Sequence, residues 1–117
     1  MDFAVFKHLV QSFTFTPAYN GGTTFNLTDG NTNASGNLAP GSYTVVESAV
    51  AGWTLTGLSC TGDTDNGSTL TVGTGTAAID LDAGENIVCT FTNTKQPILT
   101  LQKTVINNDG GTAVDTN

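Results

Sequence analysis

Short runs in which apolar and polar residues alternate follow one another along most of the chain, separated by glycine, asparagine, aspartate and proline. A period of two residues is typical of half-buried β-strands, and no stretch shows the longer period of an amphipathic helix. The pattern predicts strands over residues 3–10, 12–19, 23–29, 42–49, 53–60, 68–73, 76–81 and 86–93. Seven or eight strands at this spacing indicate an all-β protein, a β-sandwich with one face of each strand in the core.

The end of the chain repeats the pattern of its beginning. The segments FAVFKHL (residues 3–9) and LTLQKTV (residues 99–105) each place two apolar residues, a lysine and another apolar residue at alternate positions. Pro97 interrupts the alternation between the last predicted strand and the second segment. We therefore predict one domain over residues 1–95, and over 96–117 a linker with an extra strand that begins a following repeat or serves as a donor strand.

Three predicted strands carry one polar residue in an otherwise apolar row. It is Lys7 in the first strand, Glu47 in the strand at 42–49 and Asn93 near the end of the last strand. Isolated charges are costly to bury, so such groups pair or lose their charge. Taken one at a time, the alternative is a solvated lysine, an exposed glutamate and a turn-forming asparagine.

If these three side chains meet in a dry pocket, they can react with one another. Desolvation favours the uncharged amine of a lysine and the protonated form of a glutamic acid. The Lys7 amine could then attack the side-chain amide of Asn93, while Glu47 polarises the carbonyl and transfers protons as ammonia leaves. The product is an isopeptide bond between the first and last strands, formed in a single turnover, so the domain is not expected to be an enzyme.

The cysteine count and the charge narrow the class of protein. Two cysteines, Cys60 and Cys89, favour a disulfide over a zinc site, because two thiols cannot complete a zinc tetrahedron; two buried free thiols are the alternative.

The chain has 3 Lys plus Arg against 10 Asp plus Glu, a formal net charge of −7. This balance argues against binding nucleic acid or an anionic membrane surface. Acidic chains of this kind, poor in lysine, are typical of secreted and cell-surface proteins.

The remaining segments give weaker indications of function. No apolar run is long enough to span a membrane, and residues 1–10 are too short and too amphipathic for a signal peptide. The loops at 28–33 and 62–68 gather Asp and Asn oxygens, with Asp63 and Asp65 as weak candidates for calcium ligands. Neither has the full calcium-loop pattern, and turn formation explains them better, so no metal and no cofactor are expected.

Four segments resemble the collagen-adhesin B-type (CnaB-like, prealbumin-like) repeat domains of bacterial surface proteins and pili. LAPGSYTVVE (residues 38–47) resembles the G-x-Y-x-x-x-E box, FTNTK (residues 91–95) the closing strand, and VFKHL (residues 5–9) the opening strand. SAVAGWTL (residues 48–55) is similar to the segment that follows the box. The resemblance implies an immunoglobulin-like, prealbumin-like sandwich, with Lys7 as amine, Asn93 as amide donor and Glu47 as catalytic carboxyl. Lys103 would be the lysine of the next repeat.

The resemblance implies a structural stalk or fibre module outside the cell, on a bacterial surface, with neighbouring repeats or identical subunits as partners. The first alternative is a filament protomer whose residues 98–105 complete a neighbouring subunit by β-strand addition. The second is an adhesin domain that binds a host or matrix ligand.

Overall fold

The computed structural model describes residues 11–107 of the chain. Within this range the chain forms seven β-strands and two single-turn 3-10 helices, and it contains no α-helix. In chain order the elements are β1 (Phe13–Pro17), η1 (Asn20–Gly22), β2 (Phe25–Leu27), β3 (Gly41–Glu47), β4 (Trp53–Thr61), β5 (Thr69–Thr71), η2 (Val72–Thr74), β6 (Thr76–Leu81) and β7 (Val88–Lys95).

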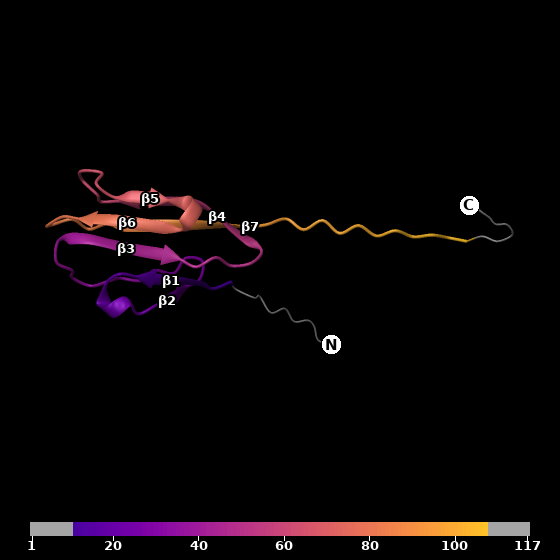
Figure 1. Ribbon diagram of the computed structural model, residues 1–117, viewed down its shortest axis with the longest axis horizontal. Helices are drawn as coiled ribbons and strands as arrows, with labels where there is room; N and C mark the ends of the chain where they lie inside the picture. The colour runs from indigo at the N-terminus through magenta and orange to yellow at the C-terminus, as the bar shows by residue number, and fades with distance from the viewer. Residues whose placement is uncertain (1–10, 108–117) are drawn as a thin grey trace.

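The strands form two antiparallel sheets. The larger sheet has the order β2-β1-β3-β6-β5, and the smaller one, which lies behind it in Figure 1, pairs β4 with β7. Sequential strands that switch between sheets are typical of a sandwich, in which each sheet covers the apolar face of the other. The predicted all-β sandwich is therefore confirmed.

The core lies between the sheets and is built from aromatic and small apolar side chains. Phe15 of β1, Val45 of β3 and Ala77 of β6 are buried, with exposed fractions of 4%, 7% and 0%. The Phe15 ring stands edge-on to that of Phe91 on β7, with 5.0 Å between the centroids. A second edge-to-face pair, Phe13 and Trp53, lies 5.4 Å apart and also joins the two sheets. Such pairs stabilise a fold by about 1 kcal/mol beyond the area they bury.

The strand boundaries differ from the predicted ones by a few residues. Residues 68–73 were predicted as one strand, but β5 ends at Thr71 and the chain turns through η2, because the sequence VGTG at 72–75 favours a tight turn over extended chain. The last strand is shifted towards the C-terminus, over Val88–Lys95. The first predicted strand, at 3–10, lies outside the described residues.

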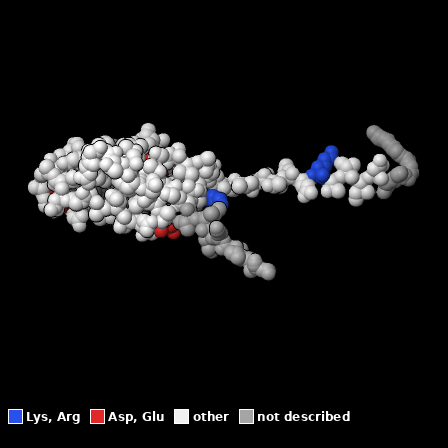
Figure 2. Space-filling model, turned by 90° about the horizontal axis from the view of Figure 1, so that it is seen from below, with Lys and Arg blue, Asp and Glu red and all other residues white. Residues whose placement is uncertain are grey.

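Beyond β7 the chain leaves the sandwich as an extended tail, residues 96–107, which runs away from the domain in Figure 1. Its first residue is fixed, because the Gln96 backbone N–H donates to the Gly52 carbonyl oxygen at 2.8 Å. The extra strand expected here is not formed within residues 96–107, which are extended and pair with no described strand. On the face seen in Figure 2, positive charge lies on the tail and where it leaves the sandwich.

The tail exposes apolar side chains that water solvates poorly. The exposed fractions are 85% for Ile98, 83% for Leu99, 84% for Leu101, 73% for Val105 and 78% for Ile106. Several large apolar side chains exposed along one short segment are unusual for solvated chain.

Candidate functional site

Glu47 is the last residue of β3, where the strand passes into the core. It pairs with Phe15 of β1 in the sheet register, and only 8% of its surface is exposed. The apolar surroundings raise the pKa of its carboxyl above the ordinary value, because desolvation disfavours the charged form, and a hydrogen bond from Asn93 partly opposes this. The exposed-glutamate alternative is therefore wrong, and the predicted inward row of β3 is confirmed.

The backbone at Glu47 is held by the turn before β6. The Glu47 backbone N–H donates to the Gly75 carbonyl oxygen at 2.8 Å. Gly75 has a left-handed conformation with φ of 66°, and a Cβ atom there would lie 2.9 Å from the Glu47 carbonyl oxygen. Glycine tolerates both the left-handed conformation and the close approach of the Glu47 carbonyl oxygen, because it has no Cβ atom. Sequence reasoning missed this contact, although VGTG at 72–75 is a turn signal directly before a strand.

Asn93 approaches Glu47 from the opposite sheet. It lies on β7 opposite Leu55 of β4, next to a register shift between Leu55 and Gly57. Its side chain is half-buried on the same face as Cys89 and Phe91, while the alternate residues of β7 are exposed. The Asn93 Nδ2 donates a hydrogen bond of 2.7 Å to Glu47 Oε2. The asparagine therefore continues the inward row and is not a turn former.

The hydrogen bond decides which role Glu47 can take in this arrangement. It engages the amide nitrogen of Asn93 and leaves the amide carbonyl for other partners. A carboxyl group at the nitrogen can deliver a proton to the group that departs as ammonia, and a raised pKa makes the protonated acid more available. This contact suits the predicted proton transfer to the leaving nitrogen, while the predicted polarisation of the carbonyl stays a prediction.

The two candidate lysines are placed differently. Lys7 lies outside the described residues, so its meeting with Glu47 and Asn93 stays a prediction. Lys103 lies on the extended tail and is exposed. The candidate site described by the structure is thus the acceptor half of the proposed chemistry: an amide, a carboxyl group and the aromatic ring of Phe91 on the Asn93 side.

The predicted disulfide is present between Cys60 and Cys89. These residues are direct cross-strand neighbours on β4 and β7, and 29 positions separate them in the sequence. The bond joins the two strands of the smaller sheet near the start of β7, while Asn93 lies near its end. Free thiols, the alternative reading, are excluded.

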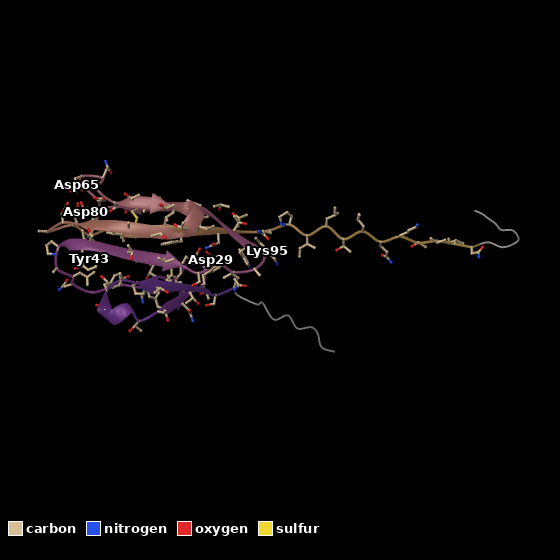
Figure 3. All side chains as sticks on the ribbon, in the orientation of Figure 1. Asp29, Tyr43, Asp65, Asp80 and Lys95 are labelled. Carbon is tan, nitrogen blue, oxygen red and sulfur yellow. A yellow bond between two sulfur atoms is a disulfide. The ribbon has the colours of Figure 1, made fainter. Side chains whose placement is uncertain are left out.

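A group of carboxylates occupies the end of the sandwich opposite the tail, where Figure 3 shows Asp65 and Asp80 far from Lys95. The weak metal candidates, Asp63 and Asp65, lie there with Glu85, and their oxygens are within 4.8 Å of one another. Asp63 accepts from the Ser68 backbone N–H, and Glu85 accepts from the N–H groups of Thr64 and Asp82, each at 2.8 Å. These bonds stabilise the two loops, which fits the predicted role in turns.

Asp80 and Asp82 also lie in this group, which was not predicted, although IDLDAGE at 79–85 alternates acidic and apolar residues. The pKa of Asp82 is raised to about 6, first by a hydrogen bond shared with Asp65, then by desolvation and by repulsion from the neighbouring carboxylates. The pKa values of Asp63 and Glu85 are lowered by the hydrogen bonds they accept. The group therefore contains both stabilised anions and one carboxyl that holds its proton more tightly.

An all-β sandwich with a hydrogen-bonded Glu47–Asn93 pair between the sheets and a cross-strand disulfide defines a prealbumin-like module. The profile of the SpaA-type prealbumin-like fold domain matches residues 5–95, most of the chain, and the chain belongs to this family. Domains of this family are structural and belong to surface pilus proteins, which agrees with the resemblance found in the sequence. No match was found among curated proteins or among solved structures. Within residues 11–107, no helix is long and apolar enough to cross a membrane.

Proposed function

We propose that this domain is a stalk or fibre module of a repetitive bacterial surface protein, and that a self-formed isopeptide bond between Lys7 and Asn93 strengthens it. The observation that carries the proposal is the 2.7 Å hydrogen bond between Asn93 Nδ2 and the buried Glu47 carboxyl. A buried carboxyl paired with an amide, with no cation beside it among the described residues, is an arrangement suited to proton transfer. The family match supports the structural role.

The reaction would need only these three side chains. The uncharged Lys7 amine attacks the side-chain amide carbon of Asn93, and a new carbon–nitrogen bond forms as the bond to Nδ2 breaks. One proton of the amine passes by way of Glu47 to the departing nitrogen, which leaves as ammonia. The bond would tie the first strand to the last, so that a force applied at the two ends of the domain is carried by covalent bonds.

Intact-mass measurement of the purified, reduced chain tests this reaction. We expect a mass one ammonia below the value calculated from the sequence, and a peptide in which Lys7 and Asn93 are joined. Lys7→Ala and Asn93→Ala should each restore the full mass, because each removes one of the two bonded atoms.

Glu47→Gln separates the chemistry from the packing, since it keeps the size of the side chain and its contact with Asn93. The variant should fold and retain the full mass. Glu85→Gln is the matched control, because that glutamate lies in the carboxylate group at the other end of the sandwich, and it should still lose ammonia. An unmodified mass for the wild-type chain would refute the isopeptide bond and leave only the structural role.

A further inference from the structure

The smaller sheet contains a β-bulge directly opposite Asn93. Leu55 of β4 pairs with Asn93, but the next pair along the two strands is Gly57 with Thr92. Thr56 lies between these pairs and has no partner in the register, so it is the extra residue of the bulge. Its side chain is exposed.

The bulge lets both halves of β4 face the core. Before it the less exposed residues of the strand have odd numbers, and beyond it they are Leu58 and Cys60. The inward row of β7 keeps to odd numbers from Cys89 to Asn93. An uninterrupted register would turn one half of β4 outward, because a slip of one residue moves every side chain to the other face. The bulge therefore allows one pair of strands both to form the disulfide and to turn Asn93 towards Glu47.

The hydroxyl of Thr56 bonds to β7 on both sides of Asn93. Thr56 Oγ1 donates to the backbone carbonyl oxygen of Thr92 at 3.3 Å and lies 2.8 Å from Thr94 Oγ1. A hydroxyl has one proton to donate, so the Thr94 hydroxyl is the donor in the second bond. The two bonds hold the residues before and after Asn93 against the bulge. The direction of the backbone between them determines where the Asn93 side chain points.

We propose that Thr56 is a positioning residue for the isopeptide reaction, because it holds β7 at the bulge so that the Asn93 amide meets Glu47. This inference rests on the proposed function, whose chemistry it leaves unchanged. Thr56 acts through the backbone of β7, from the outer face of the sheet. The hydrogen bond from Asn93 Nδ2 to Glu47 Oε2 is 2.7 Å long, and a small rotation of the backbone at Asn93 would break it. Misplacing a reacting group by about 1 Å can slow a reaction by about a hundredfold.

The rate of ammonia loss tests this role. The full chain is purified in urea, where it is unfolded and unreacted, and its intact mass is followed after dilution into refolding buffer. Thr56→Val keeps the shape of the side chain without the hydroxyl and should slow the loss of ammonia at least about tenfold. Thr56→Ser keeps the hydroxyl and should react at close to the wild-type rate. Thr90→Val is the matched control, because it alters another exposed threonine of the same sheet, and it should leave the rate unchanged.

Thr94→Val tests the same contact from the other strand. It removes only the second bond, so its rate should fall between those of the wild-type chain and Thr56→Val. Added to Thr56→Val it should slow the reaction little further, because both bonds pass through the Thr56 hydroxyl. If Thr56→Val does not fold, Thr94→Val compared with Thr90→Val carries the test of the rate.

Titration of Glu47 separates positioning from general stability. In a chain with Lys7→Met, which cannot react, the hydrogen bond from Asn93 lowers the pKa of Glu47 and opposes the effect of burial. Thr56→Val should weaken that bond and raise the pKa of Glu47 further, while Thr90→Val should leave it unchanged. NMR of the Glu47 carboxyl carbon measures the titration. If the Lys7→Met chain does not fold, Lys7→Arg provides another unreactive background for the same comparison.

Slower loss of ammonia together with a raised pKa of Glu47 supports the proposal. A folded Thr56→Val chain that reacts at the wild-type rate overturns it. A slower reaction with an unchanged pKa also overturns it, since the delay would then come from folding alone. If the wild-type chain loses no ammonia, the isopeptide reaction is rejected and the role of Thr56 in it falls too. The Glu47 titration then decides separately whether Thr56 orients Asn93.

Discussion

Glu47 takes its position from a contact in the backbone. Its carbonyl oxygen lies where a Cβ atom on residue 75 would come within 2.9 Å, and its own N–H is bound by the carbonyl of that residue. The carboxyl group that faces Asn93 thus depends on a glycine in a left-handed turn 28 positions further along the chain. Side-chain packing alone would not hold the Glu47 backbone in this position.

Substituting Gly75 should therefore disturb both stability and the site. We expect Gly75→Ala to lower the free energy of unfolding by about 1–3 kcal/mol, because alanine is strained at φ of 66° and its Cβ meets the Glu47 backbone. Urea denaturation measures the change. Gly73→Ala is the matched control, since a Cβ there would have open space, and its effect should be close to zero. Equal losses for both variants would contradict the argument.

The carboxylate group gives the domain a specific dependence on pH. The pKa of Asp82 is raised from 3.8 to about 6, so the folded chain binds this proton more tightly than the unfolded chain. The contribution of Asp82 to stability is present at low pH and is lost as the pH rises through about 6. Between about 4 and 6, the free energy of unfolding should fall with rising pH on account of this group. The raised pKa of Glu47 acts in the same direction.

Asp65→Asn isolates the part due to Asp82. An asparagine removes the shared proton and the repulsion from Asp65, so the slope of stability against pH between about 4 and 6 should become flatter than in the wild-type chain. Denaturation midpoints at several pH values measure it. An unchanged slope would show that the Asp65–Asp82 contact does not shift this titration.

At the scale of the elements, β7 is the strand on which the candidate functions converge. It carries Cys89 near its start and Asn93 near its end, and the disulfide and the hydrogen bond to Glu47 tie it to different partners. Its partner β4 is interrupted by the register shift at Leu55 and Gly57, opposite Asn93 and Thr92. Irregularities of this kind are common next to functional residues, because they re-aim a side chain.

Removing the disulfide should weaken the smaller sheet more than any of its single hydrogen bonds would. The loop-entropy account assigns about 3–4 kcal/mol to a bond that closes a loop of this length. We expect the double variant Cys60→Ala with Cys89→Ala to lose that much stability, measured by guanidinium denaturation. The wild-type chain under reductant should show a similar loss. A change below about 1 kcal/mol would contradict this account, because it would mean that the disulfide restricts the unfolded chain little.

Sequence reasoning found the faces of β3 and β7 because the period of two is a local property. Tyr43, Val45 and Glu47 alternate with residues that are more exposed, as do Cys89, Phe91 and Asn93, and burial follows from these rows. Strand ends and the contact of Gly75 with Glu47 were not predictable, since they depend on residues brought together by the fold. The same holds for the carboxylate group, whose members come from two loops and one strand.

At the scale of the whole molecule, the tail beyond Pro97 contributes little to the folding free energy of the sandwich. The last anchored residue is Gln96, whose backbone N–H binds Gly52 and whose side chain donates to Thr54 Oγ1 at 2.9 Å. The apolar residues beyond Pro97 are at least 73% exposed. Nothing in the described part of the tail beyond Pro97 stabilises the domain it follows.

Deleting residues 98–117 should accordingly leave the thermal unfolding midpoint of a dilute sample within about 1 °C of that of the full chain, because the side chains of the described residues 98–107 are exposed. Calorimetry measures the midpoint. A clear drop in the midpoint would mean that the tail packs against its own domain.

The Cys60–Cys89 bond has a consequence for how far the domain can stretch. The 29 positions between the two cysteines cannot be pulled straight while the bond is closed. At about 3.4 Å for each residue, they represent a hidden length of roughly 100 Å. The disulfide limits extension only where force reaches residues 60–89, because a Lys7–Asn93 bond would carry the load past them. In single-molecule pulling of the Asn93→Ala chain, which cannot form that bond, the unfolding step should lengthen by about this amount after reduction.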